Sequence, residues 1–146
     1  MENKTVNVTN LKTDLTDDDK LLLIRDLSYR LPYNSLCASF NEEFTGCSVG
    51  KLVCMVNEFK QYGYTDIELR IDENNVVNTI IDFCRPVLKR PESMSLPDVQ
   101  EFIKVMDDAK QADGLNTKLI DWFCEHQIDF YGLIDKGLAI DYHLIY

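Results

Sequence analysis

Five cysteines and two histidines are the residues of this sequence whose types best suit catalysis or metal binding. The cysteines are Cys37, Cys47, Cys54, Cys84 and Cys124, and the histidines are His126 and His143. A cysteine activated by histidine can act as a nucleophile, and the same residue types can hold zinc. No two cysteines have C-x-x-C spacing, and each lies in an apolar stretch. This pattern predicts free core thiols in a reducing compartment rather than a disulfide framework.

The spacing of the histidines argues against both kinds of site. Cys124 and His126 are two residues apart, so on a helix their side chains point away from each other. His126 and Asp129 could share a helical face, but no third ligand is evident and Asp129 is well placed to cap a helix. His143 could meet a cysteine only through the tertiary fold. We therefore predict no catalytic residues, no metal site and no cofactor, with an enzyme of an unrecognised type as an alternative.

Other catalytic signatures are missing from the sequence. It contains no G-x-S-x-G elbow, no phosphate-binding P-loop and no H-E-x-x-H. Adjacent carboxylates occur at Glu42–Glu43, at Asp72–Glu73 and at Asp107–Asp108. Each pair falls at an expected turn, helix end or solvated face. A general acid would need a pocket that raises its pKa, and adjacency alone does not supply one.

The charge of the chain is its most unusual property. Twenty-five acidic and fifteen basic residues give a net charge of −10. This charge disfavours nucleic acid and anionic membranes as partners and suits a basic protein surface. Residues 91–146 hold eleven acids and four bases, a net charge of −7. The candidate partner-binding residues are therefore the acids of the C-terminal helices: Asp107, Asp108, Asp113, Asp121 and Glu125.

Hydrophobic periodicity predicts an α+β fold of one domain over residues 16–146, preceded by a flexible lead-in over 1–15 with a short edge strand at Thr5–Thr9. Thr16 caps a helix within 16–31, where Leu21, Ile24 and Leu27 form an apolar stripe. Residues 35–84 are β-rich. Four strands, at 36–40, 48–56, 66–72 and 76–83, predict an antiparallel meander or a small open barrel.

The last third of the chain returns to helical spacing. Two prolines make residues 85–94 an extended linker. A capping box at Ser95 and Asp98 opens a helix with Phe102 and Ile103 on its apolar face, and a second helix follows the glycine at 114. Asp129 is expected to cap a short third helix. Residues 95–146 therefore form a helical part of two to three helices.

Three blocks of the sequence resemble a known group of proteins. They are Arg30–Tyr33 (RLPY), Arg85-Pro86 with Glu92–Ser95 after it, and the run from Asp121-Trp122-Phe123 through His126 to Asp129–Ala139 (DFYGLIDKGLA). The chain is similar here to small proteins of Bacteroides-type gut bacteria and of their phages and prophages, a group without an assigned activity. Where relatives carry a His-His pair, this chain has His126 followed by Gln127. The resemblance implies a phage or mobile-element context and supplies no activity.

Together these observations favour a non-enzymatic protein-interaction module, encoded by a phage or prophage, whose acidic helical face binds a basic protein. The alternative is a structural or accessory component of a virion or replication complex. No signal peptide and no membrane-length apolar run is visible, so we expect a cytoplasmic protein, in the host cytoplasm if a phage encodes it. The sequence leaves the oligomeric state open.

Overall fold

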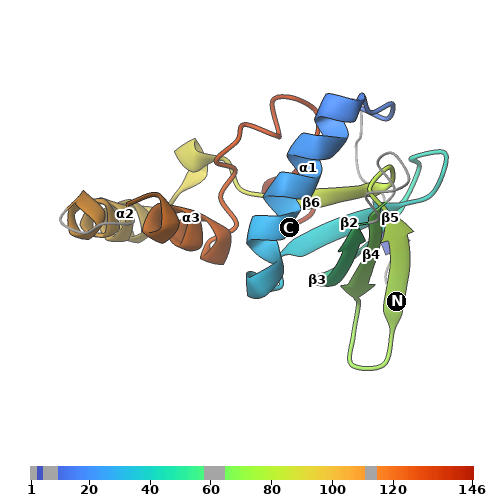
Figure 1. Ribbon diagram of the computed structural model, residues 1–146, viewed down its shortest axis with the longest axis horizontal. Coiled ribbons are helices and arrows are strands. Elements are labelled where there is room, and N and C mark those ends of the chain that lie inside the picture. The colour runs from blue at the N-terminus through green and yellow to red at the C-terminus, as the bar shows by residue number, and fades with distance from the viewer. Residues whose placement is uncertain (1–2, 5–9, 58–64, 111–114) are drawn as a thin grey trace.

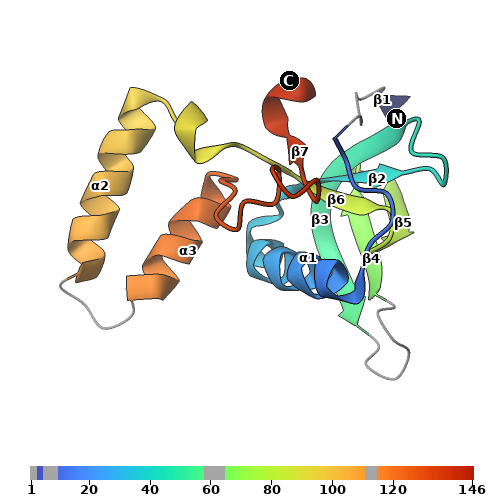
Figure 2. The same cartoon turned by 90° about the horizontal axis from the view of Figure 1, so that it is seen from above.

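The computed structural model describes residues 3–4, 10–57, 65–110 and 115–146, which form an α+β fold (Figure 1). Helix α1 (Asp17–Arg30) lies against a curved sheet. Two further helices, α2 (Leu96–Lys110) and α3 (Leu115–Glu125), stand to one side of the sheet (Figure 2). The fold class and the order of helix, sheet and C-terminal helices agree with the sequence prediction.

Helix α1 begins where the sequence predicts because its first turn is capped twice. Thr16 Oγ1 accepts a hydrogen bond from the backbone N–H of Asp19 at 3.1 Å, and the Asp19 carboxylate accepts one from the backbone N–H of Thr16 at 3.0 Å. The predicted apolar stripe is wrong at Leu21, whose side chain is 64% exposed. The buried face carries Leu23 and Leu27 together with two charged residues, and these charges hide the face from a hydropathy pattern.

The described residues form seven strands in one sheet, and all but one of their pairings are antiparallel. The strands are β1 (Asn3–Lys4), β2 (Leu36–Phe40), β3 (Cys47–Asn57), β4 (Thr65–Arg70), β5 (Val76–Ile80), β6 (Cys84–Leu88) and β7 (Ile140–Asp141). Their order is β5-β4-β3-β2-β6-β7, with β1 beside the start of β3 and with β7 parallel to β6. Strands β2 to β5 are the four that the sequence predicts, so the predicted number is an undercount. The edge strand predicted at 5–9 lies outside the described residues.

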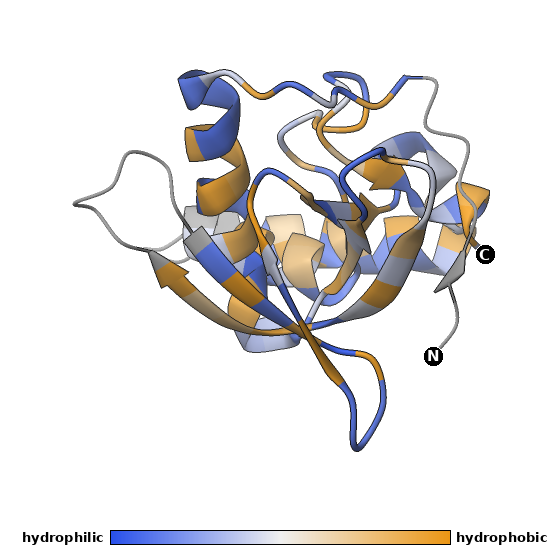
Figure 3. Ribbon diagram, turned by 90° about the vertical axis from the view of Figure 1, so that its right-hand side faces the viewer, coloured by the Kyte–Doolittle hydropathy of each residue, from blue (hydrophilic) through white to orange (hydrophobic). Residues whose placement is uncertain are grey.

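Some strands of the sheet are buried on one face only, and others are buried on both faces. On β4, Ile67 and Leu69 are buried while their neighbours are exposed, and bands of opposite hydropathy alternate along the strands (Figure 3). Strands β2 and β6 instead contribute to two hydrophobic clusters. Cys37 belongs to the cluster beneath α1, whereas Ala38 and Val87 belong to a second cluster. A strand buried on both faces has no polar alternation to identify it.

The linker predicted over 85–94 is wrong in its first half, because residues 84–88 form β6, buried at every position. Strand β6 tolerates Pro86 because of where this residue falls in the pairing with β2. The backbone N–H of Phe40 donates to the carbonyl of Phe83 at 2.8 Å, so this opposed pair is hydrogen-bonded. Such pairs alternate with unbonded ones, and Cys37 and Pro86 fall in the unbonded class. The missing N–H of Pro86 therefore removes no bond between β2 and β6.

The connection from β5 to β6 makes the sheet curl. Residues 81–83 alone join Ile80 to Cys84, and this span reaches at most about 14 Å. In a flat sheet, four strand spacings of about 4.8 Å would separate β5 from β6. The backbone N–H of Phe83 donates to the carbonyl of Ile80 at 3.0 Å, so the end of β5 lies beside the start of β6. The described parts of β5 and β6 do not pair, and the sheet stays open.

Strand β3 comes close to the backbone at the end of β4 at Gly50. A Cβ atom at Gly50 would lie 2.8 Å from the carbonyl oxygen of Arg70 and 2.9 Å from Cδ1 of Ile71. Two residues further on, the register between β3 and β4 shifts between Leu52 and Cys54. A bulge of this kind bends a strand and raises its twist.

The C-terminal part contains two α-helices. Helix α2 packs mainly on α3, and α3 packs on α1, so α2 and α3 form a two-helix arm beside the sheet (Figure 2). The third helix predicted after Asp129 is a series of turns. Three short 3-10 helices complete the described structure: η1 (Leu31–Tyr33), η2 (Pro91–Ser93) and η3 (Tyr142–Leu144). No helix in the described ranges is long and apolar enough to cross a bilayer.

Candidate functional site

The structure distributes the predicted partner-binding acids along the arm. Asp107 and Asp108 are exposed near the C-terminal end of α2, and Glu125 is exposed at the last residue of α3. Because the two helices run antiparallel, Glu125 lies at the opposite end of the arm from the aspartates (Figure 2). Asp121 is half-buried and accepts a hydrogen bond from the Tyr33 hydroxyl at 2.6 Å. Asp113 lies outside the described residues.

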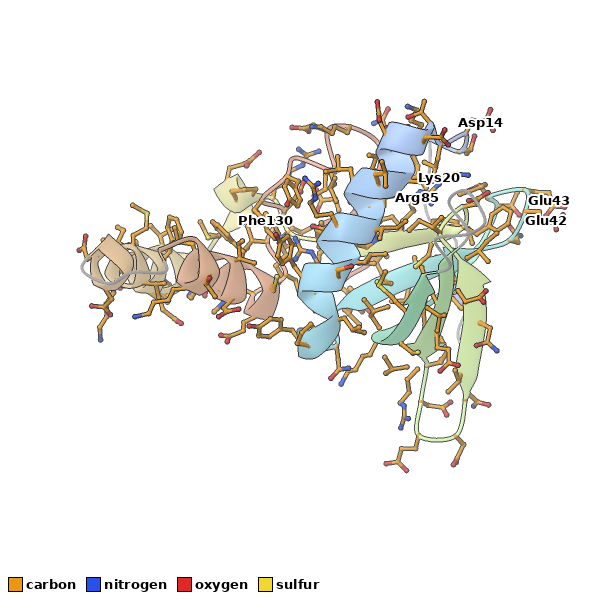
Figure 4. All side chains as sticks on the ribbon, viewed as in Figure 1. Asp14, Lys20, Glu42, Glu43, Arg85 and Phe130 are labelled. Atoms are coloured by element: carbon orange, nitrogen blue, oxygen red, sulfur yellow. The ribbon has the colours of Figure 1, made fainter. Side chains whose placement is uncertain are left out.

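The hydrogen bond of Asp121 is one of the contacts by which the arm is held to the body. It joins α3 to η1, which continues α1. Phe130 lies between α1 and the arm (Figure 4), its ring stacked on Phe123 of α3 at 5.7 Å. The guanidinium of Arg30 on α1 lies 4.9 Å from the centroid of the same ring. Asp121 therefore supports the fold, and of the predicted acids that the structure describes, Asp107, Asp108 and Glu125 are exposed.

The outer face of α2 carries a regular stripe of exposed residues. Leu96, Gln100, Ile103 and Asp107 follow one another at steps of four, three and four residues, which align on a helix of 3.6 residues per turn. Leu96 is 69% exposed and Ile103 is 52% exposed. We call these four residues the outer stripe. The sequence prediction assigned Ile103 to the packed face of the helix, and this assignment is wrong.

The inner face of α2 explains why the outer stripe is left free. The Phe102 ring packs against Trp122 and Phe123 of α3, at centroid distances of 5.3 and 5.5 Å. Glu101 accepts a hydrogen bond from the indole N–H of Trp122 at 3.2 Å. These contacts fix the rotation of α2. The outer stripe lies about 100–160° around the helix from Phe102, so it points away from α3.

The two histidines have structural surroundings rather than ligand partners. The His126 ring stacks on Trp122 at 4.1 Å, with Nε2 at 3.8 Å from Glu101. Asp129 does not face it: the Asp129 carboxylate accepts hydrogen bonds from the backbone N–H groups of Leu133 and Ile134. The predicted capping role of Asp129 is thus present, although a turn takes the place of the helix. Within the described residues, no group of three or more metal-ligating side chains could hold a metal ion.

His143 is exposed, in contrast to the buried thiols of the core. It lies in η3, its backbone N–H donates to Asp141 at 3.0 Å, and its ring meets Tyr142 edge-on at 5.7 Å. All five cysteines are free thiols, and Cys37, Cys47, Cys84 and Cys124 are buried as the sequence predicts. The prediction is wrong at Cys54, which is half-buried.

Two of the core thiols, Cys37 and Cys124, are poor nucleophiles. The hydrogen bond that the Cys37 thiol donates to Cys84, together with complete burial, raises the pKa of Cys37 well above its usual value. Burial raises the pKa of Cys124 to about 11. Both groups stay protonated at neutral pH, and a thiol attacks only as its thiolate.

Near these cysteines lies a buried ion pair that the sequence did not reveal. Arg30 Nε donates to the Asp26 carboxylate at 2.9 Å, and both side chains are 0% exposed. Arg30 Nη2 also donates to the carbonyl of Ile128 at 2.7 Å, which ties α1 to the chain after α3. Burial raises the pKa of Asp26, and Arg30 opposes this shift. The spacing of four residues on a helix was a signal for the pair, but nothing in the sequence indicated its burial.

The architecture is an α+β fold in which a curled sheet carries a projecting two-helix arm. No family model matches the chain. No curated protein and no solved structure is significantly similar to it.

Proposed function

We propose that this protein is a non-enzymatic interaction module, and that the outer face of α2 binds a protein partner with a basic, partly apolar surface. The outer stripe is the observation that carries this proposal. Two large apolar side chains, Leu96 and Ile103, stand exposed seven residues apart, which is the spacing of the anchors by which a helix lies in an apolar groove.

Charge determines the kind of groove that would accept this helix. The exposed charged residues described on α2 are Glu101, Lys104, Asp107 and Asp108, so acids outnumber bases. Asp107 belongs to the outer stripe itself, and Asp108 lies beside it. Lysine or arginine at the rim of a partner's groove would meet these carboxylates while the apolar anchors enter the groove. The charge would mainly speed association, and the anchors would supply most of the affinity.

Two paired variants test the proposal on a tagged, full-length protein used to capture partners from infected cells after crosslinking. Leu96→Ala/Ile103→Ala removes the anchors, and Asp107→Asn/Asp108→Asn removes the charges. Two control variants make changes of the same kind elsewhere. Leu21→Ala shortens an equally exposed leucine on α1, and Glu42→Gln/Glu43→Gln removes two exposed charges from the loop between β2 and β3.

We expect both α2 variants to weaken capture of the same partner at least tenfold, and the controls to retain it. Raising the salt from 0.1 to 1 M shortens the screening length from about 10 to about 3 Å, so capture should fall with salt in the wild type and less in Asp107→Asn/Asp108→Asn. If the amount of captured partner changes neither with salt nor in the α2 variants, the proposal is refuted. Recovery of the protein from purified particles would favour the alternative, a virion component.

The biological setting of this function remains a separate proposal. The sequence resemblance supports a phage or prophage as the source of the protein, and a host protein as its partner. A basic partner whose surface normally contacts nucleic acid would fit the acidic helix, because carboxylates can occupy sites built for phosphates. Competition between DNA and this protein for the captured partner would test that setting.

A further inference from the structure

Arg85 is a buried cation for which the described structure holds no acidic partner. Its side chain is 0% exposed. Nη1 donates to the carbonyls of Ile81 and Cys84, each at 2.9 Å, and Nη2 donates to the carbonyl of Lys12 at 3.2 Å. Nε has no hydrogen-bond partner among the described residues. Arg30, the other buried arginine, has Asp26 as its counter-ion, so the fold compensates one buried guanidinium and leaves the other to neutral carbonyls.

The acids nearest to Arg85 are each engaged by a lysine. Asp19 pairs with Lys12 at 2.5 Å, and Asp82 pairs with Lys20 at 3.3 Å. These two ion pairs therefore leave the Arg85 guanidinium without a carboxylate of its own. Burial lowers the pKa of Arg85 to about 10, so the guanidinium is still charged at neutral pH. A buried charge without a counter-ion is costly, and an anion would relieve that cost.

The free edge of the guanidinium has the geometry to bind a carboxylate. Nε and Nη2 lie on the same edge of the group, the edge with which arginine donates two parallel hydrogen bonds to a carboxylate. Nε is unused, and the bond that Nη2 makes is the longest of the three hydrogen bonds of Arg85. The Phe44 ring lies 5.5 Å from the guanidinium carbon. Phe44 has φ of +56°, a left-handed conformation that is rare for a bulky residue and is found more often at functional sites.

A short stretch of chain, Asn10–Leu15, covers this edge, and we call it the strap. The Lys12 N–H donates to the carbonyl of Gly137 at 2.8 Å, and the Lys12 carbonyl accepts the bond from Arg85. Figure 4 shows Arg85 and Lys20 on the side of α1 that faces the loop between β2 and β3, where Glu42 and Glu43 project outward. The strap is thus held by the backbone contacts of Lys12, by the ion pair of Lys12 with Asp19, and by the partly buried Leu11 and Leu15.

We propose that Arg85 is a latent carboxylate-binding site, and that a carboxylate displaces the carbonyl of Lys12 and opens the strap. The ligand presents two oxygens to Nε and Nη2, and its charge neutralises the buried cation. In the ligand-free protein the strap acts as an intramolecular competitor. The observed affinity is therefore the affinity of the open site multiplied by the fraction of molecules with an open strap.

The test titrates full-length protein with sodium acetate at constant ionic strength, with sodium chloride as the balancing salt. The NMR signal of the Arg85 Nε–H reports binding, and amide exchange at Lys12 reports opening of the strap. We expect a saturable shift of the Arg85 signal, faster exchange at Lys12, and no such response to chloride. Arg85→Met should abolish the exchange response, whereas Arg25→Met, which removes the same charge from an exposed site on α1, should keep it.

A second variant keeps the test decisive if Arg85→Met fails to fold. Gly137 has φ of +73°, and a Cβ there would lie 2.7 Å from the carbonyl oxygen of Asn10. Gly137→Ala should loosen the strap without touching Arg85, so the Kd for acetate should fall by the factor by which the open fraction rises. Faster exchange at Lys12 with an unchanged Kd would overturn the proposal, as would the lack of any saturable acetate response.

The same titration identifies the ligand. Phosphate that binds more tightly than acetate would overturn the assignment to a carboxylate. A short aspartate-containing peptide that binds more tightly than acetate would support the site and identify a protein side chain as the source. Acetate binding equal to that of the peptide would support the site with a free small carboxylate as its ligand.

Discussion

The buried pair of Asp26 and Arg30 offers the sharpest test of how this fold is held together. Removing one partner of a buried, hydrogen-bonded ion pair typically costs about 3–5 kcal/mol, because the other charge is left without compensation. Asp26→Leu strands the Arg30 guanidinium in this way. Arg30→Met strands the Asp26 carboxylate and also leaves the carbonyl of Ile128 without its donor, which adds about 1–3 kcal/mol.

The double variant Asp26→Leu/Arg30→Met removes both charges at once. Two apolar side chains of similar volume can replace a buried pair at little cost. The remaining loss is then the carbonyl of Ile128, about 1–3 kcal/mol. We therefore expect the double variant to be more stable than either single variant, with a coupling energy of several kcal/mol.

Urea unfolding at neutral pH, followed by circular dichroism and by fluorescence, measures these differences. The chain has one tryptophan, Trp122, so fluorescence reports the arm while circular dichroism reports the whole molecule. Coincident transitions would justify a two-state treatment. Additive losses, with the double variant less stable than both single variants, would refute the reasoning, because they would mean that the two charges do not compensate each other.

Two further predictions concern the arm. Trp122 is 4% exposed, so Trp122→Ala should lower the free energy of unfolding by about 3–5 kcal/mol and the melting temperature in calorimetry by roughly 10–20 °C. Unchanged stability with loss of partner binding would contradict this structural role. The hydrogen bond to Asp121 raises the pKa of Tyr33 from 10.0 to about 12, so the folded state holds the phenol proton more tightly than the unfolded state does. The resulting stabilisation is complete below pH 10 and is lost as the pH rises towards 12. In unfolding experiments over this pH range, Tyr33→Phe should therefore lose less stability than the wild type. Equal losses would show that the hydrogen bond does not hold the proton.

The sequence by itself determined the elements whose signals are local. The capping box at Thr16 and Asp19 requires only residues three apart, so the start of α1 was predictable to the residue. The alternation of polar and apolar residues on β4 likewise identifies a strand with one solvent-exposed face. The buried cysteines followed from their apolar neighbours. For the proposed site, the acidity of residues 91–146 was enough to place the candidate residues on the C-terminal helices that form the arm.

Only the tertiary structure decided which faces of these elements are covered. Strand β6 escaped prediction because it is buried on both faces and contains a proline in an unbonded position of the ladder, and both facts depend on β2. Ile103 and Leu21 fit helical stripes in the sequence, yet both are exposed, because periodicity gives a spacing and not the side on which the neighbour packs.

The charged interior depended on the tertiary structure most of all. Arg30 bonds to Ile128, 98 residues away, and Arg85 bonds to Lys12, 73 residues away. A composition gives the number of charges in a chain, but burial and pairing arise from contacts between distant segments. For that reason the same residue type is compensated at Arg30 and left with neutral carbonyls at Arg85, and no reading of the chain in order could distinguish the two.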